Sequence, residues 1–240
     1  MSSLLADRLH RRFPFVTTAL VLVSVAVFAF ELTLPRYGLT RQGFYAKVGA
    51  VPFELAHGYD VPPADLVPWW ATAFTALTIH GGWLHLAFNV LYLAYFGAGV
   101  EERIGGLRFF GLFLVCGIVA TAAQVVAATG STVPVIGASG AVAGVLGAYL
   151  ALRLRAGAPA VSRPGGALSR IPVPARILLA VWSGLLVLQG VFAFGHTQVA
   201  VAFFAHVAGL VAGLALAVPL GRRGRRERGG DPGVRRAPSV

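Results

Sequence analysis

Charged residues are scarce in this chain: Asp, Glu, Lys and Arg together make up 12% of its 240 residues, whereas 57% are hydrophobic. A water-soluble domain of this length carries about a quarter charged residues. Half of that charge leaves too little polar surface to cover a globule in water. The composition therefore excludes an ordinary soluble domain and predicts an integral membrane protein.

Cysteine is almost absent, because Cys116 is the single one and lies inside an apolar run. One cysteine excludes an intramolecular disulfide and cannot build a thiolate metal site. The net charge of +11 could indicate a nucleic-acid partner, but its distribution argues against one. Seven arginines lie in the last twenty residues, and most of the others flank apolar runs. This pattern is typical of topology signals and of attraction to anionic membrane lipids.

Long apolar runs are abundant, and six of them approach the roughly 20 residues that a helix needs to cross a bilayer. The expected spans are 13–34, 71–96, 109–128, 135–152, 177–194 and 199–220. The predicted fold class is therefore all-α, a polytopic membrane protein with a bundle of six transmembrane helices. The first span could be a signal peptide, but its apolar core is longer than usual and no A-x-A-like cleavage site follows it, which favours an uncleaved anchor.

The arginines also predict an orientation. The N-terminal tail (1–12), the loop 153–176 and the C-terminal tail (221–240) are rich in arginine. If six helices alternate, these regions share one side of the membrane, and the positive-inside rule places both termini in the cytoplasm. We expect a multi-pass protein of a bacterial plasma membrane. The long link 35–70 is expected at the outer membrane interface, and the tail beyond Gly221 is expected to be disordered.

A few polar residues interrupt the apolar segments, where such groups are costly and often functional. The second segment carries His80, His85 and Asn89. His85 and Asn89 are four residues apart, so they share one helix face. They fit either a polar clamp between helices or a pair of donors to one cavity. A metal site made by the histidines is disfavoured, because the segments that carry them have no carboxylate and no H-E-x-x-H spacing.

Ser139 lies in the stretch "VIGASGAVAGVLG" (135–147). A lone serine in a membrane helix is most often a packing residue. Pro134 and Gly137 precede it, however, so a helix is expected to begin near the serine and to direct its N-terminal amides toward a developing oxyanion. Gly140 follows and begins a stripe of small residues.

His206 lies in the sixth segment and is followed by Gly209 and Gly213, a second stripe of small residues. Two such stripes let helices pack with their backbones nearly in contact, which would bring the imidazole within reach of Ser139. That pair is the minimal nucleophile and base unit. In the predicted topology the serine and the histidines all fall in the outer half of the membrane.

In this order and spacing, the motifs resemble those of the rhomboid family of intramembrane serine proteases. The resemblance rests on "GASGAVAG" (137–144), "HGGWLHLAFN" (80–89), "FGAGVEERIGGLRFF" (96–110) and "AHVAGLVAG" (205–213), and it covers residues 13–220. It implies a six-helix protease domain over 13–220, with 35–70 as an external first loop.

The resemblance also implies roles for single residues. Ser139 would be the nucleophile and His206 the general base. The Ser139 amide and the side chains of His85 and Asn89 would form an oxyanion hole that Gly137 shapes. Structural roles near the site would fall to the residues His80, Gly140, Gly209 and Glu101. Two departures are present: Ala143 replaces an aromatic that stacks on the histidine in some members, and a Trp-Arg pair of the first loop is absent.

The implied reaction is peptide-bond hydrolysis through an acyl-enzyme, with no cofactor and no metal. The implied partners are single-pass transmembrane substrates and membrane lipids, with no nucleic acid. Two other readings stay open. A proteolytically inactive relative would bind membrane clients, and a small transporter would use the three histidines as a proton relay.

Overall fold

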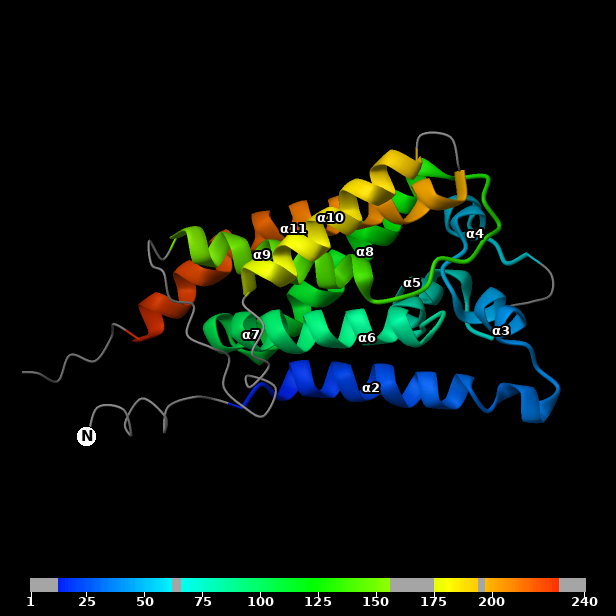
Figure 1. Cartoon of the computed structure of the whole chain (residues 1–240), viewed down its shortest axis with the longest axis horizontal. Coiled ribbons are helices and arrows are strands. Elements are labelled where there is room, and N and C mark those ends of the chain that lie inside the picture. Colours follow the sequence, from blue (N-terminus) through cyan, green and yellow to red (C-terminus); the bar gives the residue numbers. More distant parts are fainter. Residues whose placement is uncertain (1–12, 62–65, 156–174, 194–196, 229–240) are drawn as a thin grey trace, which may run out of the picture.

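Helices make up most of the protein in a computed structural model, which describes residues 13–61, 66–155, 175–193 and 197–228 (Figure 1). The predicted all-α fold is confirmed, and within these ranges the only pairing of extended backbone is an isolated bridge between Ala50 and Val135. The predicted tail 1–12, most of the loop 153–176 and the tail from 229 onward lie outside the described residues.

The helices follow one another along the chain, with short 3₁₀ and π turns labelled η. Their bounds are α2 (Phe15–Glu31), η1 (Leu34–Tyr37), α3 (Arg41–Val48), α4 (Pro52–His57), η2 (Trp69–Ala71), α5 (Thr72–Thr75), η3 (Ala76–Thr78), α6 (Trp83–Tyr92), η4 (Leu93–Gly97), α7 (Ala98–Ile104), α8 (Gly106–Ala127), α9 (Ser139–Arg155), α10 (Ala175–Ala193) and α11 (Thr197–Arg228).

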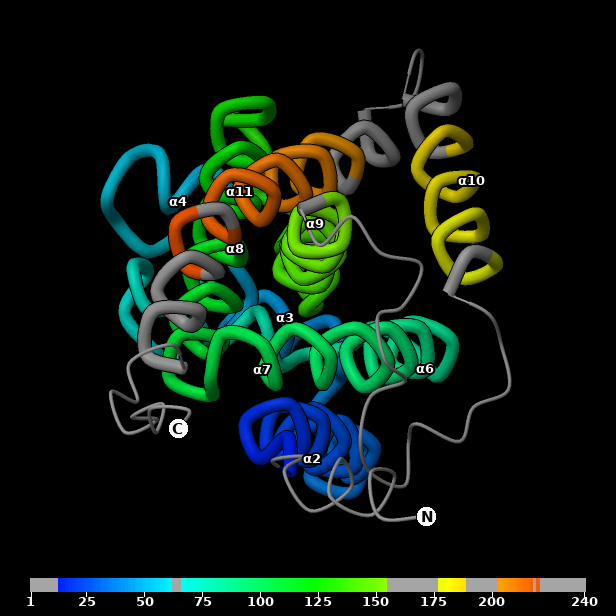
Figure 2. Tube along the Cα trace, turned by 90° about the vertical axis from the view of Figure 1, so that its left-hand side faces the viewer, coloured from blue at the N-terminus to red at the C-terminus, as the bar shows by residue number. Residues whose placement is uncertain are grey.

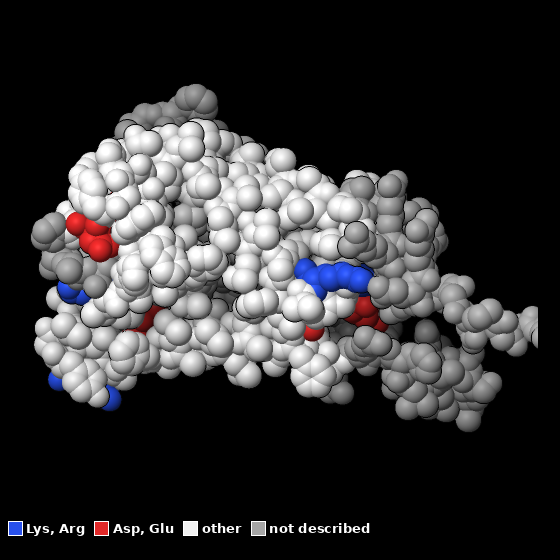
Figure 3. All heavy atoms as spheres, turned by 180° about the vertical axis from the view of Figure 1, so that it is seen from behind, with Lys and Arg blue, Asp and Glu red and all other residues white. Residues whose placement is uncertain are grey.

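Six long helical units overlap the six predicted apolar segments, the second being the continuous run from α6 through η4 to α7. Among the described residues, two helices are both long and apolar enough to span a bilayer, Trp83–Ile104 and Gly106–Ala127. Four shorter apolar helices accompany them, at Phe15–Glu31, Ser139–Leu154, Ile177–Leu188 and Phe203–Ala217. Figure 3 shows charged side chains toward the two ends of the molecule, with a broad uncharged surface between them.

The second segment differs from its predicted bounds of 71–96. Short turns occupy its first residues, the backbone is extended at Ile79, and α6 begins only at Trp83. The glycines 81 and 82 explain the late start, because glycine lowers helix propensity and favours extended or turn backbone. The helix then runs on to Ile104 and ends at Gly105, whose φ is +86°.

The sixth segment is also longer than expected, because α11 continues past Leu220 to Arg228. The expected disorder of the tail 221–240 stays a prediction, because the helix covers only its first residues and the tail from 229 onward lies outside the described residues. Arginine is a good helix former, and cations are stabilised near the C-terminus of a helix by its dipole.

Helix α9 lies at the centre of the bundle, and the end-on view shows it among α6, α8, α10 and α11 (Figure 2). The contact between α9 and α11 uses the two predicted stripes of small residues. A Cβ added to Gly209 would collide with the Gly140 carbonyl oxygen, and one added to Gly213 would collide with that of Gly144. The backbones are therefore in direct contact, as predicted, because no side chain separates them.

Helix α2 is attached to α7 through a buried carboxylate. Glu101 accepts hydrogen bonds from the amides of Val16 and Thr17, at 3.0 and 2.8 Å, and from the Thr17 hydroxyl at 2.7 Å. The two amides belong to the first turn of α2, where backbone N–H groups have no partner within the helix. Glu101 thus caps α2 from a distant element and holds the start of α2 against α7.

Candidate active site

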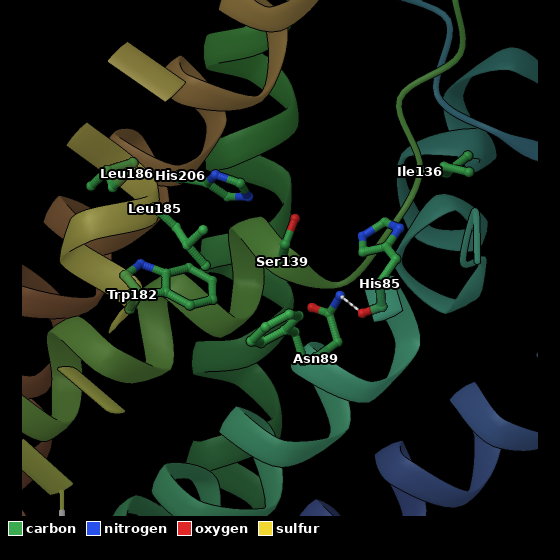
Figure 4. A pocket seen from close by; sticks show the side chains of 9 residues that line it. His85, Asn89, Ile136, Ser139, Trp182, Leu185, Leu186 and His206 are labelled. Atoms are coloured by element: carbon green, nitrogen blue, oxygen red, sulfur yellow. Dashed lines mark hydrogen bonds between the residues drawn. The ribbon is translucent and has the colours of Figure 1, made fainter. Parts of the chain in front are cut away.

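A cavity of about 260 Å³ opens between helices α6, α9, α10 and α11. Its lining residues are His85, Phe88, Asn89, Ile136, Ser139, Trp182, Leu185, Leu186 and His206. The structure thus brings four of the predicted site residues to one place from three separate helices. Figure 4 shows the Ser139 hydroxyl pointing into the space between the rings of His206 and His85.

Ser139 is the first residue of α9, as the preceding proline and glycine predict. The chain reaches it through Gly137, which has a φ of +111° and donates its N–H to the Ala76 carbonyl at 2.8 Å. The serine amide therefore belongs to the first turn of a helix, where N–H groups lack intrahelical acceptors and the helix dipole is positive. This place suits a hydroxyl that attacks a carbonyl and an amide that binds the resulting anion.

His85 projects from α6 toward Gly137. A Cβ on Gly137 would lie 2.5 Å from both Cε1 and Nε2 of the His85 ring, so only glycine fits there. The Gly81 amide donates a hydrogen bond to His85 Nδ1 at 3.3 Å. Because Nδ1 accepts, the neutral ring carries its proton on Nε2. Nε2 of His85 is therefore a hydrogen-bond donor, as a member of an oxyanion hole must be.

Asn89 lies one helical turn after His85 and lines the same cavity. Its Nδ2 donates to the His85 carbonyl oxygen at 2.9 Å, which fixes the orientation of the amide. A primary amide has two N–H donors, so one remains to serve the cavity. The pair thus shares one face of α6, as the four-residue spacing predicts.

His206 is buried on α11, and the indole of Trp182 packs against its ring edge-to-face, with centroids 5.6 Å apart and an interplanar angle of 65°. This contact supplies an aromatic neighbour, although Ala143 replaces the residue that stacks there in some family members. Trp182 belongs to an aromatic row, since its ring also lies 5.0 Å from that of Tyr92. Sequence reasoning missed Trp182, and its only signal was an aromatic inside the fifth apolar segment.

His80 does not line the cavity, but its ring lies behind that of His85 in an edge-to-face contact at 5.2 Å. The ring is fully buried, and its Nδ1 lies 3.1 Å from the Thr78 carbonyl oxygen. Its backbone is bound by residues of α2 and α3. In the part of the chain that the structure covers, no group of three or more His, Cys, Asp or Glu side chains is placed to hold a metal ion.

A family model of the Rhomboid domain matches residues 68–223, which is more than half of the chain and includes every residue of the cavity. The chain belongs to the rhomboid family. Its sequence is also similar to that of the rhomboid protease AarA of Providencia stuartii, with 26% identity over 103 residues. That match covers 43% of this chain and 34% of AarA, so it spans only about a third of the length of that relative. Membership of the rhomboid family, together with the apolar helices, makes the chain a membrane protein.

Proposed function

We propose that this rhomboid protein is an intramembrane serine endopeptidase in which Ser139 is the nucleophile and His206 the general base. The observation that carries the proposal is that one shared cavity receives the serine from α9, the imidazole from α11 and two hydrogen-bond donors from α6. The membrane-protein family and a relative that is named a protease support the same reading.

The reaction would proceed by nucleophilic catalysis. His206 accepts the proton of the Ser139 hydroxyl as the oxygen attacks the substrate carbonyl, and later returns that proton to the leaving amine. A water molecule then attacks the acyl-enzyme, with His206 again as the base. The ester bond to Ser139 breaks, and His206 returns the proton to the serine oxygen as the acid product leaves. The unit is a Ser-His dyad, without a carboxylate as a third member. The reaction needs neither a cofactor nor a metal.

The negative charge of each tetrahedral intermediate would be held by three donors. These are the Ser139 amide, His85 Nε2 and Asn89 Nδ2. Such preorganised donors act strongly inside a water-poor site, and loss of one typically costs about 10²–10³ in rate. The tautomer of His85 and the orientation of Asn89, both held by hydrogen bonds to the backbone, fit this role.

The substrate would be a single-pass membrane protein cut near its outer end. A helical substrate has its carbonyls bonded internally, so a segment must become extended before Ser139 can attack it. The approach to Ser139 is itself non-helical, with Val135 paired to Ala50 of the first loop. The apolar side chains of Ile136, Leu185 and Leu186 in the cavity favour small or apolar substrate residues. Both chain termini would face the cytoplasm.

The test is cleavage of a model transmembrane substrate by the purified protein in detergent or liposomes. Ser139→Ala and His206→Ala are expected to lower cleavage by at least about 10³, because each removes a member of the dyad. Ser183→Ala is the matched control, since Ser183 lies on α10 next to Trp182 but does not line the cavity. Cleavage retained in a folded Ser139→Ala protein would refute the proposal. A folded wild-type protein that binds the substrate without cleaving it would favour an inactive relative. Histidine-dependent transport without cleavage would instead favour the transporter.

A further inference from the structure

The dyad and oxyanion hole do not use a buried carboxylate that lies nearby. Glu31 is the last residue of α2 and is fully buried. Its oxygens accept from Arg41 Nη2 at 3.3 Å, from the Tyr45 hydroxyl at 3.1 Å and from the His80 amide at 3.1 Å. A buried charge in a membrane protein is costly unless it is paired and hydrogen-bonded. The Glu31 carboxylate therefore needs the three partners in this cluster to stay in place.

The two other side chains of the cluster converge on one carbonyl. Arg41 Nη2 donates to the His80 carbonyl oxygen at 2.9 Å, and the Tyr45 hydroxyl lies 3.2 Å from the same oxygen. The guanidinium is itself held over the rings of Phe28 and Tyr45, at 5.3 and 5.6 Å from their centroids. Burial, followed by the nearby Glu31 carboxylate, raises the pKa of Tyr45 to about 12, so its hydroxyl keeps its proton at physiological pH.

The His80 carbonyl belongs to the same planar peptide unit as the Gly81 amide. The carbonyl end of this unit is bound by Arg41 and Tyr45, and its N–H end donates to His85 Nδ1. A rigid unit that is fixed at one end has a fixed direction at the other. A charge-assisted hydrogen bond on the oxygen also polarises the N–H and strengthens its bond to the imidazole.

The segment after this peptide has little stiffness of its own. Gly81 and Gly82 are adjacent, and glycine restricts the backbone less than any other residue. A Cβ on Gly81 would meet only ordinary contacts, 3.6 Å from Ile136 and 3.8 Å from His85, and one on Gly82 would meet nothing within 4 Å. The direction of the Gly81 amide therefore depends on the anchor at His80.

We propose that Glu31 and Arg41 are positioning residues for the oxyanion hole. Through the His80–Gly81 peptide they hold His85 in the ring orientation and tautomer that present Nε2–H to the cavity. The inference rests on the proposed protease function and assigns a role to a partly buried ion pair between α2 and α3. The competing explanation is an ion pair that only attaches the first loop to α2.

Glu31→Gln removes the charge and keeps the size of the side chain. The expected result is a fall of about tenfold in kcat with KM changed less than about twofold, because the donors act on the transition state rather than on substrate binding. The rate of labelling by a fluorophosphonate, which also forms an oxyanion at the serine, should fall in parallel. Glu54→Gln is the matched control, since this buried carboxylate of α4 accepts from the Val61 amide at 2.8 Å and lies outside the cluster.

A double-mutant cycle separates positioning from simple stability. Arg41→Gln, at a side chain that is 26% exposed, is made both alone and together with His85→Ala. If Arg41 acts through His85, it lowers the labelling rate about tenfold in the wild-type protein and less than about twofold once His85 is removed. Equal losses in both backgrounds, or full activity of both Glu31→Gln and Arg41→Gln, would overturn the inference.

Thermal unfolding in detergent shows whether each variant folds. If Glu31→Gln does not fold, Arg41→Gln and Tyr45→Phe carry the same test, and wild-type rates in these two would reject the role. The proposed function fails differently, because then even the wild-type protein is neither labelled nor active.

Discussion

Gly137 is the residue at which a single methyl group should act most directly on the site. Gly137→Ala places a Cβ 2.5 Å from the His85 ring and puts an L-residue at a φ of +111°. We expect cleavage to fall by about 10² or more, because the ring that supplies an oxyanion donor must move. The backbone strain by itself should lower stability by about 1–3 kcal/mol.

The control for this variant is Gly111→Ala in α8, where an added Cβ would meet nothing within 4 Å. It should cleave at the wild-type rate and unfold at the same or a higher temperature, since alanine favours a helix over glycine by about 1 kcal/mol. A Gly137→Ala protein within threefold of wild-type activity would show that His85 does not work from its observed position.

At the scale of helices, the α9–α11 contact holds the nucleophile against its base. Gly213→Ala adds a methyl group that collides with the Gly144 carbonyl oxygen. Overpacking of this kind typically costs about 1–3 kcal/mol, so the unfolding temperature in detergent should fall. Gly184→Ala in α10, where a Cβ would meet nothing within 4 Å, should not lower it. If Gly213→Ala and the wild-type protein unfolded at equal temperatures, α9 and α11 would have to move apart at little cost.

Hydropathy and small-residue spacing located much of this arrangement in advance. The start of α9 at Ser139 and the contact of its glycines with α11 follow from Pro134, Gly137 and the stripe spacing. The late start of α6 at Trp83 could not be predicted in this way, because a hydropathy window averages over Gly81 and Gly82.

Two contacts between side chains of distant elements could not be predicted from the sequence. Glu31 lies in the predicted apolar span 13–34 and Arg41 in the link 35–70, yet the fold pairs them beside His80. Trp182 likewise meets His206 only because α10 packs next to α11. In each case the partner lies on another helix, and no local spacing encodes it.

For the whole molecule, the expected orientation can be tested with cysteines, because the single natural one, Cys116, is buried. His57→Cys in α4 and Leu154→Cys near the end of α9 both replace exposed residues. A membrane-impermeant maleimide added to intact cells should label position 57 and should label position 154 only after permeabilisation. The reverse pattern would contradict the predicted cytoplasmic termini.

The central claim is that Ser139 is an activated nucleophile. The most direct measurement is incubation of the folded protein with a fluorophosphonate, followed by mass spectrometry of the adduct. We expect one adduct, on Ser139, that is absent from Ser139→Ala and forms at least about 10²-fold more slowly in His206→Ala, because the hydroxyl needs its base. His57→Ala, which alters an exposed histidine outside the cavity, should leave labelling unchanged. An unlabelled wild-type protein, or an adduct on another serine, would show that Ser139 is not the activated nucleophile.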